Sequence, residues 1–144
     1  MSRTRRVLHW SAGLVLAVAG AGALQSHAEP VQEFTIVAQS GVAHFVYVSP
    51  SGLQDNNFVA QVLDAVTRRH GKGRAIQVMM FDDKQYTPHG FPMTDAQMKH
   101  QRAQYNYNPN TNYERFVWLT VANPSSSPPE LKETEAKIRP GYTD

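Results

Sequence analysis

Two short apolar segments separated by turn residues predict a β-hairpin at the start of the folded part of the chain. Residues 33–38 (EFTIVA) and 43–49 (AHFVYVS) are rich in β-branched and aromatic side chains, and residues 39–42 (QSGV) separate them. Such side chains are enriched in strands because they fit a pleated, half-buried surface. We therefore expect two antiparallel strands, the first at an edge of the sheet.

A helical period follows this hairpin. Asp55 or Ser51 fits the N-cap of the helix, and Gly71 fits the residue that closes it. The apolar side chains of its single face are Phe58, Val59, Val62, Leu63 and Val66. A face of this kind lies against a sheet. The nearly continuous apolar run 75–81 (AIQVMMF) comes next and is typical of a strand buried on both faces.

The second half of the chain predicts a loop, a helix and another loop. Residues 82–93 contain two prolines and a glycine without any periodicity, which indicates a loop. Thr94 and Gln97 have the spacing of a capping box, so we expect a polar surface helix over residues 94–105. Residues 106–112 (NYNPNTN) have the composition of a loop.

One more strand and a short helix complete the predicted elements. Residues 115–121 (RFVWLTV) have the composition of a strand. Ser127 and Pro128 then fit the first positions of a charged helix after a polar linker. The sequence thus predicts one α/β domain over residues 29–123, followed by a linker and short helix over residues 124–144.

The predicted order of elements is β-β-α-β-α-β-α. A strand–helix–strand series favours right-handed crossovers and a sheet that is at least partly parallel. We expect a single small domain with a mixed sheet of about four strands and helices packed on it. An α+β arrangement is the alternative.

The first residues have the pattern of an export signal over residues 1–28. Three arginines lie within residues 1–6, residues 13–24 are uninterrupted and apolar, and residues 26–28 (SHA) are suited to cleavage. The apolar stretch is shorter than the roughly 20 residues of a membrane-spanning helix. We expect a periplasmic or secreted protein with no membrane span after cleavage. An uncleaved anchor and a twin-arginine signal are the alternatives.

The charge balance changes once this segment is set apart. The chain has 14 Lys and Arg against 12 Asp and Glu, and a pI near 9.0. Three of the 14 lie in residues 1–28 with no acidic residue, which leaves 11 against 12. A nearly neutral remainder argues against nucleic-acid binding. The basic run 68–74 (RRHGKGR) is the exception, and at a helix end it complements the helix dipole.

The absence of cysteine excludes disulfides, cysteine-ligated zinc and thiol catalysis. The histidines lack the spacing of a metal motif, so no metal or other cofactor is expected. Asp82 and Asp83 follow a buried strand, where α/β proteins bind ligands, and His89 lies in the loop beyond. Asp82 or Asp83 could act as an acid or hold a divalent cation, with His89 as the base. The alternative is that the acidic pair simply ends a strand.

Tyrosine and asparagine gather between residues 105 and 113. Flat rings beside amide groups suit carbohydrate or peptide recognition, although the same composition also suits a tight loop. The candidate ligand-binding residues are Tyr86, Tyr105, Tyr107, Asn108, Asn110 and Tyr113.

These observations favour an exported binding or accessory module over an enzyme. We expect it to recognise a protein or a cell-envelope component through loops 83–93 and 105–113, because long ordered loops tend to carry function. A small hydrolase that uses Asp82, Asp83 and His89, with or without a metal, is the alternative. The residues do not identify the ligand.

Overall fold

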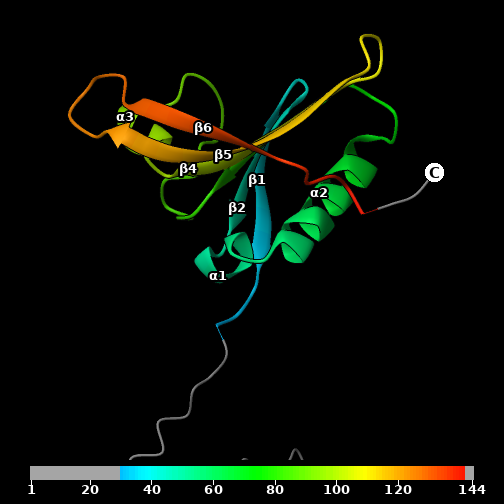
Figure 1. Ribbon diagram of the computed structural model, residues 1–144, viewed down its shortest axis with the longest axis horizontal. Helices are drawn as coiled ribbons and strands as arrows, with labels where there is room; N and C mark the ends of the chain where they lie inside the picture. Colours follow the sequence, from blue (N-terminus) through cyan, green and yellow to red (C-terminus); the bar gives the residue numbers. More distant parts are fainter. Residues whose placement is uncertain (1–29, 142–144) are drawn as a thin grey trace, which may run out of the picture.

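The computed structural model describes residues 30–141, which form one six-stranded mixed sheet with three helices (Figure 1). The strands lie in the sheet in the order in which they occur along the chain. Only β2 and β3 pair in parallel, and every other neighbouring pair is antiparallel. The elements are β1 (Phe34–Ser40), β2 (Ala43–Val48), α1 (Pro50–Leu53), α2 (Asn56–His70), β3 (Ile76–Phe81), α3 (Asp95–Met98), β4 (Gln101–Asn108), β5 (Tyr113–Asn123) and β6 (Glu130–Ala136). The predicted export signal lies outside the described residues.

The four-stranded α/β arrangement predicted from the sequence is wrong, first because the expected helix over residues 94–105 is mostly a strand. The capping box of Thr94 and Gln97 is present, but α3 ends after one turn at Met98. The chain then enters β4, where Ala103 and Tyr105 are buried and the residues between them are less so. Burial at every second position is the period of a strand, and pairing with β3 and β5 overrides the helical propensity of this polar segment.

The predicted C-terminal helix is also a strand. Ser127 does not cap a helix, since its hydroxyl instead donates to the Asp95 carboxylate at 2.5 Å. β6 pairs along the outer side of β5, which is longer than the predicted 115–121. Without β6, the backbone groups on that side of β5 would lack protein partners. The high proportion of charged residues in β6 is typical of a strand at the edge of a sheet.

The first half of the chain agrees with the predictions. β1 lies at an edge and pairs antiparallel with β2. The Asp55 carboxylate caps α2 by accepting from the backbone of Asn57 and Phe58. Gly71 closes α2 with a φ of 117°, which favours glycine. Ser51 lies inside α1, which Ser49 caps. Within residues 30–141, no helix has the length and apolar character needed to cross a membrane.

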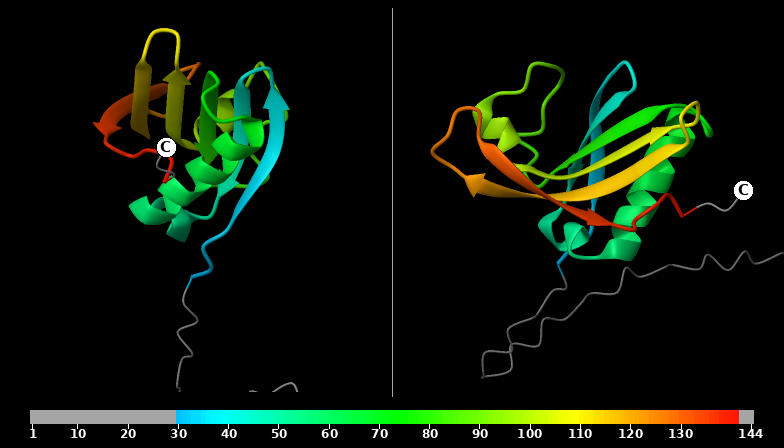
Figure 2. Two further views of the ribbon diagram at one scale, coloured as in Figure 1. Left: turned by 90° about the vertical axis from the view of Figure 1, so that its right-hand side faces the viewer. Right: turned by 45° about the horizontal axis from the view of Figure 1, so that its top comes forward.

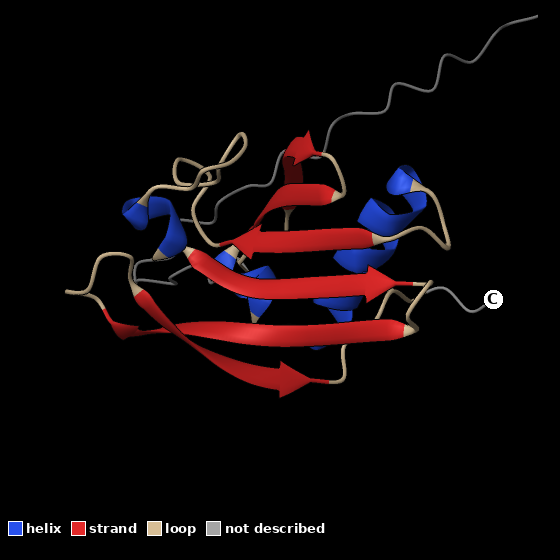
Figure 3. Cartoon of the chain, turned by 90° about the horizontal axis from the view of Figure 1, so that it is seen from above, coloured by secondary structure: helices blue, strands red, loops and turns tan. Residues whose placement is uncertain are grey.

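Different parts of the chain cover the two faces of the sheet (Figures 2 and 3). The face that we call the helix face lies against α2, and its core includes Val62, Leu63, Val78 and Tyr105. The opposite face, the loop face, has a smaller cluster of Ala43, Phe45, Met79 and Phe81. Phe91 and Met93, from the segment between β3 and β4, pack against that cluster. The predicted loop before residue 94 is therefore present and covers part of a face.

Candidate functional site

The predicted catalytic residues Asp82, Asp83 and His89 follow β3, as expected, and the contacts of the two carboxylates are with other residues. The Asp82 carboxylate contacts Arg102 Nε at 2.8 Å. The Asp83 carboxylate accepts from the Gln85 backbone at 2.8 Å, which shapes the start of the loop. His89 is exposed, and no hydrogen bond or ion pair in residues 30–141 joins it to either carboxylate. The catalytic role of these residues stays a prediction.

Asp82 instead belongs to a cluster that holds the loop to β4. Its Oδ1 atom lies 2.7 Å from His100 Nδ1. The Tyr86 ring stacks on His100 with ring centroids 4.4 Å apart and planes at 5°. The sequence predicts a surface helix through His100. In the structure His100 instead lies between α3 and β4, where its ring meets Asp82 and Tyr86. Tyr86 thus packs within the protein, although it remains a predicted ligand-binding residue.

The tyrosines of β4 point to the helix face. Tyr105 and Tyr107 are two residues apart, so they lie on the same side of the strand. Tyr105 is buried and Tyr107 is half-buried. They pair in register with Val78 and Ile76 of β3, respectively. Residues 105–113 are therefore two strands and a tight turn rather than one loop.

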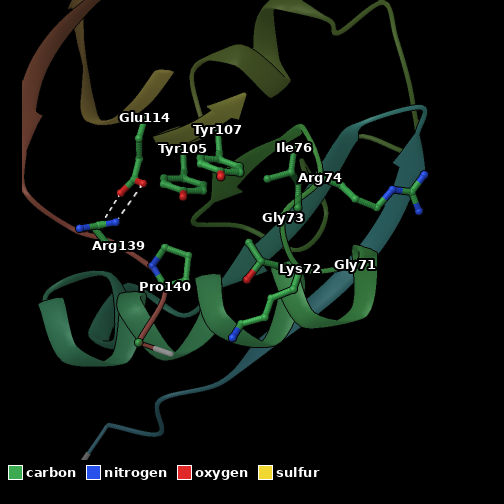
Figure 4. A pocket seen from close by; sticks show the side chains of 12 residues that line it. Gly71, Lys72, Gly73, Arg74, Ile76, Tyr105, Tyr107, Glu114, Arg139 and Pro140 are labelled. Carbon is green, nitrogen blue, oxygen red and sulfur yellow. Dashed lines mark hydrogen bonds and ion pairs between the residues drawn. The ribbon is translucent and has the colours of Figure 1, made fainter. Parts of the chain in front are cut away.

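A pocket of about 640 Å³ lies where the end of α2 meets β4 and β5 (Figure 4). The phenol oxygens of Tyr105 and Tyr107 point from β4 towards α2. Its lining consists of Thr67, Gly71, Lys72, Gly73, Arg74, Ile76, Tyr105, Tyr107, Glu114, Arg139, Pro140 and Gly141. Three separate parts of the chain thus build it: the α2–β3 turn, the β4–β5 hairpin and the segment after β6.

Basic side chains outnumber acidic ones in the part of the pocket lining that the structure describes. The Glu114 carboxylate pairs with Arg139, with Oε2 and Nη2 3.3 Å apart. Lys72 and Arg74 add two cations from the turn after α2, where Gly73 has a φ of 75°. In Figure 4, Arg74 points away from the tyrosines, whereas Lys72 extends across α2. Among residues 30–141, one acidic and three basic side chains therefore line the pocket.

A second hollow of about 640 Å³ lies on the other side of Arg74. Its lining includes Arg69, His70 and the predicted binding residue Asn110. The backbone of Asn110 donates to the Asn108 side chain at 3.0 Å, which stabilises the β4–β5 turn. Tyr113 begins β5 and is 46% exposed. Only Tyr105 and Tyr107 of the predicted binding set line the first pocket.

A histidine pair, made of the buried His44 and the half-buried His70, joins α2 to β2. His70 Nε2 lies 2.9 Å from the Ala75 carbonyl, so this nitrogen carries a proton. His44 Nε2 therefore donates to His70 Nδ1 at 3.0 Å when both rings are neutral. This leaves His44 Nδ1 buried without a hydrogen-bond partner in the structure. Burial, and then the charges of His70 and Arg69, lower the pKa of His44. His44 is thus a hydrogen-bonded structural residue of the core.

The sequence contains part of the signal for the pocket. Tyr105 and Tyr107 have strand spacing in the run YNYN, and Lys72 belongs to the basic run that we interpreted as complementing the helix dipole. No local pattern joins Glu114 to Arg139, which are 25 residues apart. Their pairing depends on β6, which the sequence wrongly predicts to be a helix.

No group of three or more His, Asp or Glu side chains within residues 30–141 is arranged to hold a metal ion. The alternative of a divalent cation at Asp82 or Asp83 thus gains no geometric support. Comparison with known proteins yields no matching family model, no similar curated protein and no similar solved structure.

Proposed function

We propose that the chain is an exported binding module that holds an acidic saccharide in the pocket between α2 and β4. Export rests on the predicted signal over residues 1–28, and a periplasmic or secreted location follows from it. The observation that carries the binding proposal is the combination of two tyrosines with an excess of cationic side chains in one concave site. A concave site with aromatic walls and a few polar groups is the usual form of a small-ligand site.

The lining favours a sugar that carries a carboxylate or phosphate group. The half-buried Tyr107 offers an apolar ring surface with a hydroxyl group, which suits the alternating apolar and hydroxyl-bearing surface of a sugar, and the buried Tyr105 forms part of the wall beside it. Lys72 supplies a flexible cation for an anionic group. The volume of about 640 Å³ lies within the range of roughly 300–1,000 Å³ that is common for small-ligand sites.

The number of carboxylates described in the pocket lining favours binding of a sugar over its cleavage. Most glycoside hydrolases use a pair of carboxyl groups on either side of the scissile bond. Within residues 30–141, the lining of this pocket has one carboxylate, Glu114, which is ion-paired with Arg139. The hydrolase alternative at Asp82, Asp83 and His89 gains no support from the contacts of those residues.

Isothermal titration calorimetry with two defined probes tests the proposal. We expect glucuronic acid oligomers to bind the purified protein, and neutral glucose oligomers of the same length to bind more weakly. Tyr107→Ala and Lys72→Ala should each weaken glucuronate binding by about tenfold, which corresponds to about 1.4 kcal/mol. Added salt should also weaken it, because part of the attraction is between exposed charges.

Matched variants outside the pocket provide the controls. Tyr113→Ala removes an exposed tyrosine of the same sheet, and Lys84→Ala removes an exposed lysine of the loop. Neither should change the affinity. Equal affinity for acidic and neutral oligomers, or an equal loss in Tyr113→Ala and Tyr107→Ala, would contradict the proposal.

A further inference from the structure

The two edges of the sheet differ in charge. β1 forms one edge, and its residues FTIVAQS include no charged side chain. β6 forms the other edge, and its residues ELKETEA include three glutamates and a lysine. Charged residues at an edge oppose pairing with another strand, so β6 is protected against such pairing. β1 lacks this protection.

The register with β2 shows which backbone groups of β1 are open. The Ser49 N–H donates to the Glu33 carbonyl at 2.9 Å, in register with the pairing of Phe34 with Val48. Hydrogen-bonded and non-hydrogen-bonded pairs alternate along an antiparallel ladder. Thr35 therefore bonds to β2, whereas the N–H and C=O groups of Phe34 and Ile36 point away from the sheet.

The open stretch is short and apolar. Phe34 is 36% exposed, and Val31 just before it is 72% exposed. The register with β2 shifts between Ile36 and Ala38, which marks a bulge at Val37. A bulge interrupts a regular ladder, so further pairing is confined to about residues 33–37.

We propose that two copies of the chain pair antiparallel through β1, with a two-fold axis at Thr35. On this axis Thr35 lies opposite Thr35 of the second copy, and Phe34 lies opposite Ile36. The open backbone groups of Phe34 and Ile36 then bond to each other across the interface. Threonine pairs and pairs of an aromatic with a β-branched residue are favourable across antiparallel strands.

The open stretch is self-complementary, and its charge allows a second copy to occupy this edge. Within the paired stretch Glu33 is the only charged residue, and the two-fold axis places it opposite Val37 of the other copy. No like charges therefore meet at the interface. A symmetric contact of this kind closes as a dimer and leaves no further open β1 edge. This inference is independent of the proposed ligand pocket.

Cysteine cross-linking tests the register directly, because the chain has no cysteine of its own. Thr35→Cys puts the only thiols on the axis, at a non-hydrogen-bonded pair with Cα atoms about 4.5 Å apart, which a disulfide spans. We expect this variant to form a covalent dimer under mild oxidation. Thr134→Cys on the β6 edge and Gln39→Cys beyond the bulge should form no covalent dimer, although both keep the non-covalent contact through β1. Equal cross-linking of all three variants would overturn the proposed register.

Sedimentation equilibrium tests the dimer without a new covalent bond. We expect the unmodified protein to sediment as a dimer, and Thr35→Lys to shift it towards the monomer, because two ammonium groups would meet on the axis. Thr134→Lys on β6 is the matched control and should stay dimeric. A monomeric unmodified protein would overturn the proposal, including the case in which β1 accepts a strand from a different protein.

Discussion

The two faces of the sheet are closed in different ways. On the helix face, α2 contributes several fully buried side chains to a core that extends from β2 to β5. On the loop face, the buried cluster has only four members, and an irregular segment covers it. That segment is held by the Asp82 pairs with His100 and Arg102 and by the contact of Phe91 with Phe45. Apolar burial dominates one face, whereas a few specific contacts hold the cover of the other.

The extent of α2 on the helix face also determines where the pocket lies. α2 ends at His70, and the sheet continues beyond it through the hairpin that carries Tyr107 and Glu114. The uncovered part of the helix face becomes the concave site. A regular helix therefore covers one part of this face and leaves another part uncovered.

The largest effect is expected for Leu63→Ala, because Leu63 is fully buried on the helix face. Removing its side chain leaves a cavity and should lower the free energy of unfolding by about 2–5 kcal/mol. Urea denaturation followed by tryptophan fluorescence measures this loss. Gln61→Ala changes an exposed position of the same helix and should shift the stability by less than about 0.5 kcal/mol. A similar small shift for Leu63→Ala would show that α2 is not the main cover of this face.

A smaller effect is expected for Asp82→Asn on the loop face. The substitution removes the charge that pairs with Arg102 and His100, all three of which are partly exposed. We expect a global loss of about 1 kcal/mol. Amide exchange should accelerate between residues 82 and 100, while α2 exchanges as before, because local opening draws on few contacts.

Asp64→Asn is the matched control for this prediction. It removes a carboxylate that pairs with the exposed Arg68 on α2, with Nε and Oδ1 2.8 Å apart. Exchange in the loop segment should not change in this variant. Uniform acceleration across both faces in Asp82→Asn would show that the two faces open together.

The smallest effect at neutral pH concerns the histidine pair under α2. Burial beside His70 and Arg69 lowers the pKa of His44 below its usual 6.5. The unfolded chain therefore takes up a proton as the pH falls through 6.5, while the folded chain resists it. Stability should decline from about pH 6.5 down to the lowered pKa of His44 and change little above pH 7.

Urea titrations at pH 7.5, 6.0 and 5.0 check this prediction. His44→Gln keeps an N–H donor for His70 but cannot titrate, so its stability should depend less steeply on pH over the same range. An identical pH dependence in the variant and the unmodified protein would assign the effect to other groups.

The sequence predicted the elements in which apolar side chains and turn or cap residues form a clear local pattern. α2 has an apolar face and complete caps, and the hairpin β1–β2 has β-branched segments around a glycine turn. The segments that form β4 and β6 were predicted to be largely helical. Their side chains are mostly polar, so the alternation of apolar and polar residues that is typical of a strand is weak. β6 in particular has charged residues at most positions, and only the long outer edge of β5 determines that it is a strand.

The same limit applies to the site. Tyr105 and Tyr107 were identified by residue type, but their shared direction depends on β4. Arg139 reaches Glu114 only because β6 runs antiparallel along β5 and brings the following segment back to the start of that strand. The acidic pair after β3 was the most visible chemical feature in the sequence. Its first member, Asp82, has structural partners because His100 and Arg102 lie beside it in the folded chain.

The strands have the same order in the sheet as in the chain, and this order affects how the protein folds during its synthesis. Each strand from β2 onward pairs with the strand that precedes it in the sequence. Short sequence separation between partners lowers the entropic cost of forming each contact and favours rapid folding. As the polypeptide emerges from the ribosome or a translocation channel, every new strand finds its partner already available. Assembly of the sheet can thus proceed in step with synthesis or transport, from β1 to β6.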